Sequence, residues 1–226
     1  MTREQIRQRV LEVGIVPVIR ASSARKAIAA AEAVCAGGIP ILEVTMTVPG
    51  AFEAIKELTK TWGREILIGA GTVLDAQTAR RCLEAGATFL VTPGFKLETV
   101  KFANDHGMVI LAGALTPTEI ITAWEAGSDF VKVFPCSSVG GASYIKALKA
   151  PLPQIPLVPT GGVNLNTAAD FIRNGSAALG IGGELVLASA LDSGNTAEIS
   201  ELAKKYVAIV QQARQGEQVP AIVAGK

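Results

Sequence analysis

The feature that most constrains the fold is a repeated unit in which a helical stretch ends in glycine and a short β-branched run follows. Clear examples are AVCAGGIPILEVT at 33–45, CLEAGATFLVT at 82–92 and AWEAGSDFVKVF at 123–134. Glycine at a helix end adopts the left-handed conformation at little steric cost. The junctions follow one another at intervals of 20 to 25 residues, the length of one strand, one helix and two loops: Gly38, Gly63, Gly86, Gly107, Gly127, Pro151 and Gly175.

The β-branched runs predict eight strands that alternate with helices. Such alternation is typical of parallel strands joined by right-handed crossovers. Eight units within 226 residues favour a closed (β/α)8 barrel, the TIM barrel, over an open doubly wound sheet. The expected strands are 15–20, 40–45, 66–69, 88–92, 109–112, 129–134, 156–160 and 177–182.

One domain is expected to account for the whole chain, 1–226. The residue content is 49% hydrophobic, which is enough for a sizeable aliphatic core. Residues 1–13 predict an extra N-terminal helix before the first strand, and 215–226 read as a loose tail. Inside the barrel region, Thr116-Pro117-Thr118-Glu119 has the spacing of a capping box and predicts a helix start.

Net charge and cysteine content limit which binding partners and which cellular compartment can be expected. The 21 basic and 20 acidic residues give a net charge of +1, which argues against a nucleic-acid or membrane-surface partner. No apolar run is long enough to span a bilayer. Cys35, Cys82 and Cys136 lack disulfide or zinc spacing, and His106 is the single histidine. We therefore expect a cytoplasmic protein without a histidine-based metal site.

The sixth expected strand places a lysine where barrels carry their chemistry, near the carboxyl end of a strand. Side chains alternate between the two faces of a strand, so Phe130, Lys132 and Phe134 should face the barrel interior. Burial lowers the pKa of an amine and makes it a candidate Schiff-base nucleophile. The alternative is a lysine at the rim that reaches solvent.

The second expected strand carries a carboxylate on its inner face. The same alternation turns Glu43 inward together with Ile41 and Thr45. Strands two and six lie opposite each other in an eight-stranded barrel, so Glu43 and Lys132 should project into one interior. Each would offset the cost of burying the other, and the carboxyl group could transfer protons beside an imine-forming amine. The alternative is a purely structural buried ion pair.

Paired glycines follow the last two expected strands. They are Gly161-Gly162 within PTGGVN and Gly182-Gly183 within GIGGE. Many barrels bind phosphate at these two loops through backbone N–H groups. Tight turns without a ligand are the alternative. The GAG sequence at 69–71 is not a dinucleotide-binding fingerprint, because the third glycine and the downstream acid are missing.

Six motifs, in order along the chain, resemble one known family. They are EVT at 43–45, GAGTV at 69–73, VTPG at 91–94, KVFP at 132–135, YIKALKAP at 144–151 and PTGGV at 159–163. Together they are similar to the 2-keto-3-deoxy-6-phosphogluconate (KDPG) and 4-hydroxy-2-oxoglutarate (KHG) aldolases. The resemblance covers residues 14 to 190 and implies a homotrimeric (β/α)8 barrel that cleaves KDPG to pyruvate and glyceraldehyde 3-phosphate.

The resemblance also implies roles for individual residues. Lys132 matches the Schiff-base lysine and Glu43 the general acid/base, with no metal and no separate cofactor. Thr72, Pro93 and Phe134 match positions that line the pyruvyl site. Thr160, Gly161 and Gly162 match positions that contact the substrate, a phosphorylated keto acid, and its phosphate. The paired glycines Gly182 and Gly183 are expected to contact the same substrate.

Two positions depart from the family pattern. Thr47 stands where some members carry an arginine near the substrate carboxylate, although other members share the threonine. Arg20, at the end of the first strand, could supply that cation; a surface arginine is the alternative. Glu184 stands where some members have a serine in the phosphate loop. An inward Glu184 would repel phosphate, whereas an outward one would leave the backbone N–H groups free.

Three other functions remain open at this level. A related aldolase could act on the galactonate epimer or on an unphosphorylated 2-keto-3-deoxy acid. A different phosphate-binding barrel, such as an epimerase or a synthase, would not need Lys132 as an imine-forming group. A catalytically silent barrel could bind sugar phosphates or act as a scaffold, although the presence of both Lys132 and Glu43 argues against it.

Overall fold

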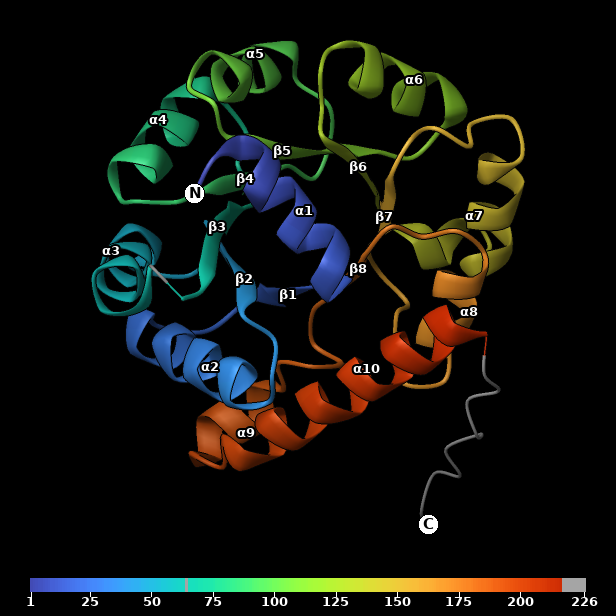
Figure 1. Cartoon of the computed structure of the whole chain (residues 1–226). Coiled ribbons are helices and arrows are strands. Elements are labelled where there is room, and N and C mark those ends of the chain that lie inside the picture. The colour runs from blue at the N-terminus through green and yellow to red at the C-terminus, as the bar shows by residue number, and fades with distance from the viewer. Residues whose placement is uncertain (64, 217–226) are drawn as a thin grey trace.

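The computed structural model describes residues 1–63 and 65–216. Its eight strands form one sheet in the order β7-β6-β5-β4-β3-β2-β1-β8, and every neighbouring pair is parallel. A parallel bridge between Thr160 and Gly180 joins the two edges, next to β7 and β8. The sheet therefore closes on itself, which confirms the predicted (β/α)8 barrel (Figure 1).

All eight expected strands are present, and most begin or end within two residues of their predicted limits. The main differences are a longer third strand and a longer fifth strand, both of which extend further toward their carboxyl ends. The strands are β1 Ile15–Ile19, β2 Ile41–Thr45, β3 Leu67–Gly71, β4 Phe89–Val91, β5 Val109–Ala114, β6 Phe130–Val133, β7 Leu157–Pro159 and β8 Leu179–Ile181.

Helices surround the strands, as Figure 1 shows. They are α1 Arg3–Val13, α2 Ala24–Ala36, α3 Ala51–Trp62, α4 Ala76–Glu84, α5 Leu97–Asp105, α6 Pro117–Glu125, α7 Ala142–Lys149, α8 Ala168–Arg173, α9 Ala188–Ser193 and α10 Ala197–Gln215, with a 3-10 turn η1 at Cys136–Val139. The short helix α9 was not expected. The long helix α10 packs against α8 and α2 and so joins the last part of the helical ring to the first.

The helix starts follow local side-chain chemistry. Thr116 and Glu119 form the predicted capping box at α6, and Ser23 accepts a backbone N–H at the start of α2. A second capping box, Thr2 with Gln5, begins α1. At the other end of the chain, Gln215 is the last residue of α10, so the expected tail starts later than 215. Residues 217–226 lie outside the described part of the chain.

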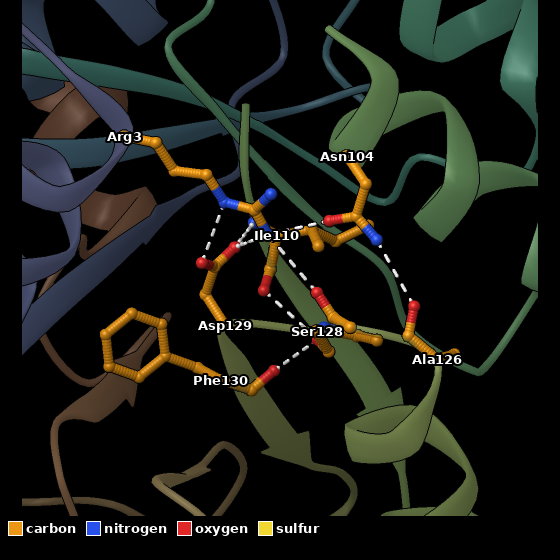
Figure 2. Close-up of polar contacts among 9 residues, drawn as sticks. Arg3, Asn104, Ile110, Ala126, Ser128, Asp129 and Phe130 are labelled. Atoms are coloured by element: carbon orange, nitrogen blue, oxygen red, sulfur yellow. Dashed lines mark hydrogen bonds and ion pairs between the residues drawn. The ribbon is translucent and has the colours of Figure 1, made fainter. Parts of the chain in front are cut away.

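Helix α1 lies across the amino-terminal end of the barrel, over the ring of strands in Figure 1. Arg3 holds it there through a two-pronged contact with Asp129, with N···O distances of 2.9 and 2.8 Å, and a 2.7 Å bond to Asn104 Oδ1 (Figure 2). Asp129 also accepts the backbone N–H of Ile110 at 2.8 Å. This carboxylate therefore ties α1 to β5 and to the segment that leads into β6, the strand of Lys132.

Arg3→Ala should destabilise the fold, because the Asp129 side chain is only 9% exposed and would lose its charged partner. We expect a loss of about 1–3 kcal/mol in the free energy of unfolding, measured by urea denaturation. Arg7→Ala is the matched control, since Arg7 on the same helix pairs, among residues 1–63 and 65–216, with the exposed Glu4 alone. That surface pair should be worth no more than about 0.5 kcal/mol. Equal losses for both variants would contradict the assigned role of Arg3.

Candidate active site

Lys132 lies on β6 between Gly113 of β5 and Val158 of β7, and it is 4% exposed. The alternative of a rim lysine that reaches solvent is therefore wrong. Its Nζ lies 5.2 Å from the ring centroid of Phe134. Within the described residues, Lys132 forms no direct ion pair and no hydrogen bond. An amine buried in this way keeps its nitrogen available for a ligand.

Glu43 lies on β2 between Val18 of β1 and Gly69 of β3, and it is 1% exposed. Its Oε1 atom is buried without a hydrogen-bond partner among the described residues. Burial raises the pKa of this carboxyl group, and the charges of Lys132 and Arg20 partly oppose the rise. The charge of Lys132 thus affects the pKa of Glu43, although the two side chains do not form the direct salt bridge that a purely structural pair would make.

The hydroxyl of Thr47 is already engaged within the protein. Thr45 Oγ1 donates its single proton to the carbonyl of Ile19 at 3.0 Å. The 2.7 Å contact between the hydroxyls of Thr45 and Thr47 must then be donated by Thr47. Because the Thr47 hydroxyl has only one proton, it cannot donate to a substrate carboxylate while it donates this hydrogen bond to Thr45. Arg20 is the other residue expected to meet the substrate carboxylate.

Arg20 stands just beyond β1 at the carboxyl end of the barrel. A Cβ atom added to Gly182 would lie 3.5 Å from its Nη1, so the guanidinium lies beside the loop that follows β8. Its charge reaches Glu43, whose pKa it lowers. Arg20 also lines a cavity of about 360 Å³ together with Lys26 and Asp192. Arg20 is exposed, so its guanidinium reaches solvent between the end of β1 and this cavity.

Two further expected residues follow β3 and β4. Thr72 has a φ of 59°, a left-handed conformation that is rare for a β-branched residue and that often marks functional sites. Pro93 approaches the backbone of Gly113 so closely that a Cβ atom at Gly113 would overlap it. Gly113 of β5 is the residue that pairs with Lys132 of β6, so this contact places Pro93 near the position of the lysine in the sheet.

The loop after β7 turns through two glycines with φ values of 92° and 78°, Gly161 and Gly162. It is tied to the loop after β6, because Cys136 N–H donates to the carbonyl of Thr160 at 2.9 Å. A Cβ atom at Gly162 would meet the side chain of Ser137. Among residues 1–63 and 65–216, the N–H groups of Gly161 and Gly162 have no acceptor, so they remain free for an anion.

The loop after β8 places Gly182 and Gly183 next to Glu184, whose side chain is exposed. The backbone carbonyl of Glu184 accepts the hydroxyl of Tyr206 at 3.4 Å. Burial raises the pKa of Tyr206, and the Glu184 carboxylate raises it further. Tyr206 belongs to α10, outside the strands. The Glu184 charge therefore reaches Tyr206 in the helical layer.

Two classes of feature are absent from the part of the chain that the structure describes. No group of three or more His, Cys, Asp or Glu residues is arranged to hold a metal ion there. No helix in these residues combines the length and apolar character that a membrane crossing requires.

A comparison with protein families finds a match over most of the chain. The family model for "KDPG and KHG aldolase" matches residues 6–202. The chain belongs to this aldolase family. Its members are carbon–carbon lyases, and the motifs around Lys132 and Glu43 fall within the matched region.

Individual relatives support the family assignment. A 2-dehydro-3-deoxy-phosphogluconate aldolase of Pseudomonas aeruginosa is 36% identical, over 86% of this chain and 88% of the relative. A KDPG aldolase of Legionella pneumophila, solved with pyruvate captured as a covalent carbinolamine, matches with a TM-score of 0.82 and 31% identity, over 88% of this chain and 96% of the other. A designed cube-shaped cage of fused symmetric oligomeric domains has a TM-score of 0.83 and 30% identity, over 91% and 74%.

Sequence reasoning turned Thr45 inward but did not foresee the site contacts of Thr45, Gly71 and Gly113. Thr45 controls the hydroxyl of Thr47, Gly113 admits Pro93, and Gly71 lies against Glu43. Strand alternation could have placed Gly71 on the inner face, since it is two residues from Gly69. The contacts themselves depend on how far each loop folds over the barrel, which the sequence does not reveal.

The charges around Glu43 predict how its titration will respond to substitution. Its midpoint should lie above the value of about 4.3 that is usual for glutamate, because burial favours the neutral form. Lys132→Met should raise the midpoint further, and Arg20→Gln should raise it by less, since Lys132 is the stronger of the two opposing charges. Carbon-13 NMR of the labelled carboxyl group measures the midpoint. An unchanged midpoint in Lys132→Met would show that the charge of Lys132 does not affect the titration of Glu43.

Proposed function

We propose that this aldolase cleaves KDPG to pyruvate and glyceraldehyde 3-phosphate through an imine formed at Lys132. One observation supports the proposal most strongly: a buried lysine without a direct ion pair faces the same interior as a buried carboxyl group with a raised pKa. Such a pair suits imine chemistry because it combines a nucleophile with a proton-transfer group. The shorter keto acid KHG, which would yield pyruvate and glyoxylate, is a second substrate of the same site.

The reaction begins with imine formation at Lys132 and ends with hydrolysis of that imine. The neutral amine of Lys132 attacks the C2 carbonyl to give a carbinolamine, and loss of water gives a protonated imine. Glu43 supplies and removes the protons of this dehydration. Glu43 then accepts the proton of the C4 hydroxyl, the C3–C4 bond breaks, and the electron pair of that bond passes into the imine to give an enamine. The aldehyde leaves, the enamine carbon takes the proton back from Glu43, and water hydrolyses the pyruvate imine. Lys132 carries the substrate, so the proposed mechanism involves no metal.

The two ends of the substrate are held differently. Arg20 pairs with the carboxylate, and the engaged hydroxyl of Thr47 supports this assignment over one to Thr47. Thr72, Pro93 and Phe134 line the space around the pyruvyl part. The free N–H groups of the glycine turn after β7 receive the phosphate together with the loop after β8, in the set Thr160, Gly161, Gly162, Gly182 and Gly183.

The assembly and the setting of the enzyme are also part of the proposal. A homotrimer would cover the exposed side chains of Leu74 and Leu97, which are 56% and 46% exposed. The resemblance to domains used in a symmetric cage supports an oligomer. Three free cysteines, Cys35, Cys82 and Cys136, are consistent with a reducing cytoplasm. The reaction would serve carbohydrate metabolism in the Entner–Doudoroff pathway.

Borohydride reduction in the presence of pyruvate should attach one pyruvyl unit to Lys132, as read by mass spectrometry and peptide mapping. Lys132→Arg keeps the charge but cannot form the imine, so it should lose turnover and labelling while its circular dichroism spectrum is preserved. Lys149 provides an internal control, because its Nζ already donates to the carbonyls of Pro153 and Ile155. Labelling at Lys146 or Lys149 in place of Lys132 would overturn the assignment.

Glu43→Gln should lower kcat on the order of 10²–10⁴-fold, the usual contribution of a general acid/base. The amide has nearly the same shape as the carboxyl group, so binding and folding should change little. Steady-state pyruvate release measures the effect. If the variant retained full activity, Glu43 would be a structural residue and not a proton-transfer group.

Phosphate preference follows from the exposed position of Glu184. The phosphorylated substrate should have a much higher kcat/KM than its dephospho analogue, because the backbone N–H groups of the loops stay free. Glu184→Ser should change this preference little. Both substrates are assayed on both proteins. Equal use of the two substrates by the wild type, or a strong shift toward phosphate in the variant, would place the Glu184 charge inside the anion site.

A further inference from the structure

Strand β3 carries two glycines on its inner face, and each leaves space for a different side chain. Gly69 pairs with Glu43 across the β2–β3 ladder, and Gly71 pairs with Thr45. A Cβ atom at Gly69 would overlap the aromatic ring of Phe89, which fills the core of the barrel. A Cβ atom at Gly71 would instead overlap the carboxyl group of Glu43. The first glycine therefore serves packing, and the second lies against a group of the proposed mechanism.

The conflict at Gly71 is specific to one side chain. The three atoms nearest to an added Cβ all belong to Glu43: Oε1, then Cδ at 2.8 Å and Cγ at 3.2 Å. Gly71 does not have a positive φ, unlike Gly161 and Gly162, so its backbone conformation suits any residue. The sequence thus has glycine at this position because Glu43 occupies the space, and not because the backbone requires it.

The carboxyl group of Glu43 is held more by shape than by hydrogen bonds. Its Oε1 is buried and has no hydrogen-bond partner among the described residues. Glu43 pairs with Gly69, but its carboxyl group lies against Gly71, which is toward the carboxyl end of β3. A methyl group at position 71 would push the carboxyl group away from this place.

We propose that Gly71 is a positioning residue that sets where the carboxyl group of Glu43 stands during proton transfer. This inference rests on the proposed function, because it acts through the role assigned to Glu43. Displacing a reacting group by about 1 Å can cost about 10²-fold in rate. Gly71→Ala should therefore lower kcat by about 10²-fold and change KM for the keto acid little, since the methyl group meets Glu43 before any other side chain.

A double-mutant cycle separates positioning from general distortion. In the Glu43→Gln background the carboxyl group is already lost, so adding Gly71→Ala should lower kcat by no more than about twofold. In the Glu43→Asp background the side chain is one methylene shorter and no longer fills the space. There, adding Gly71→Ala should cost at least about tenfold less than it costs in the wild type. The same loss in all three backgrounds would overturn the proposal, as would full activity of Gly71→Ala.

Folding and chemistry are followed in the same variants. If Gly71→Ala does not fold, as judged by circular dichroism, the combination with Glu43→Asp should restore folding, and failure of both would contradict the proposal. Gly69→Ala is the matched control from the same strand. It meets the Phe89 ring, so it should lower the unfolding temperature, and its effect should be independent of the residue at position 43. Coupling of Gly69→Ala to position 43 as strong as that of Gly71→Ala would also count against the proposal.

The failure of this inference can be told apart from failure of the proposed function. If the wild type traps no pyruvate at Lys132 with borohydride, the function itself is wrong. If the wild type traps pyruvate and Glu43→Gln is slow, but Gly71→Ala turns over normally, only the positioning role of Gly71 is wrong.

Discussion

The burial of one carboxyl group and one amine inside an aliphatic barrel is the constraint on which the rest of the site depends. Removing a charge from water is costly, and each group reduces that cost for the other only if both face the same interior. Strands β2 and β6 provide this arrangement because they lie on opposite sides of the closed sheet. The absence of a direct ion pair among the described residues leaves Lys132 free to react, and burial keeps the proton affinity of Glu43 high.

Closure of the barrel makes the other contributions possible. Parallel pairing brings the carboxyl ends of all strands to one face, where Arg20, Thr72 and the glycine turn after β7 can meet one substrate. At the opposite end, the contact between Arg3 and Asp129 holds α1 over the barrel and fixes the start of the segment that carries Lys132. Stability and chemistry are thus assigned to opposite ends of the same strands, as is general for this fold.

Much of this arrangement was predictable because it follows from local rules. The glycines at helix ends and the β-branched runs predicted all eight strands. The alternation of side chains along a strand predicted that Lys132 and Glu43 are buried in the interior. The capping box at Thr116 followed from spacing alone. The contact of Arg3 with Asp129 joins residues 126 positions apart, and nothing local signals it. The direction of the hydrogen bond between the Thr45 and Thr47 hydroxyls likewise depends on the carbonyl of Ile19, which is on another strand.

The most direct measurement is a crystal structure of the protein soaked with pyruvate and frozen before the imine hydrolyses. We predict continuous electron density from Nζ of Lys132 to C2 of pyruvate, with a carboxyl oxygen of Glu43 within hydrogen-bonding reach of the adduct or of a water beside it. The guanidinium of Arg20 should face the pyruvate carboxylate. Pyruvate bound elsewhere, or an adduct at Lys132 with Glu43 turned away from it, would contradict the account.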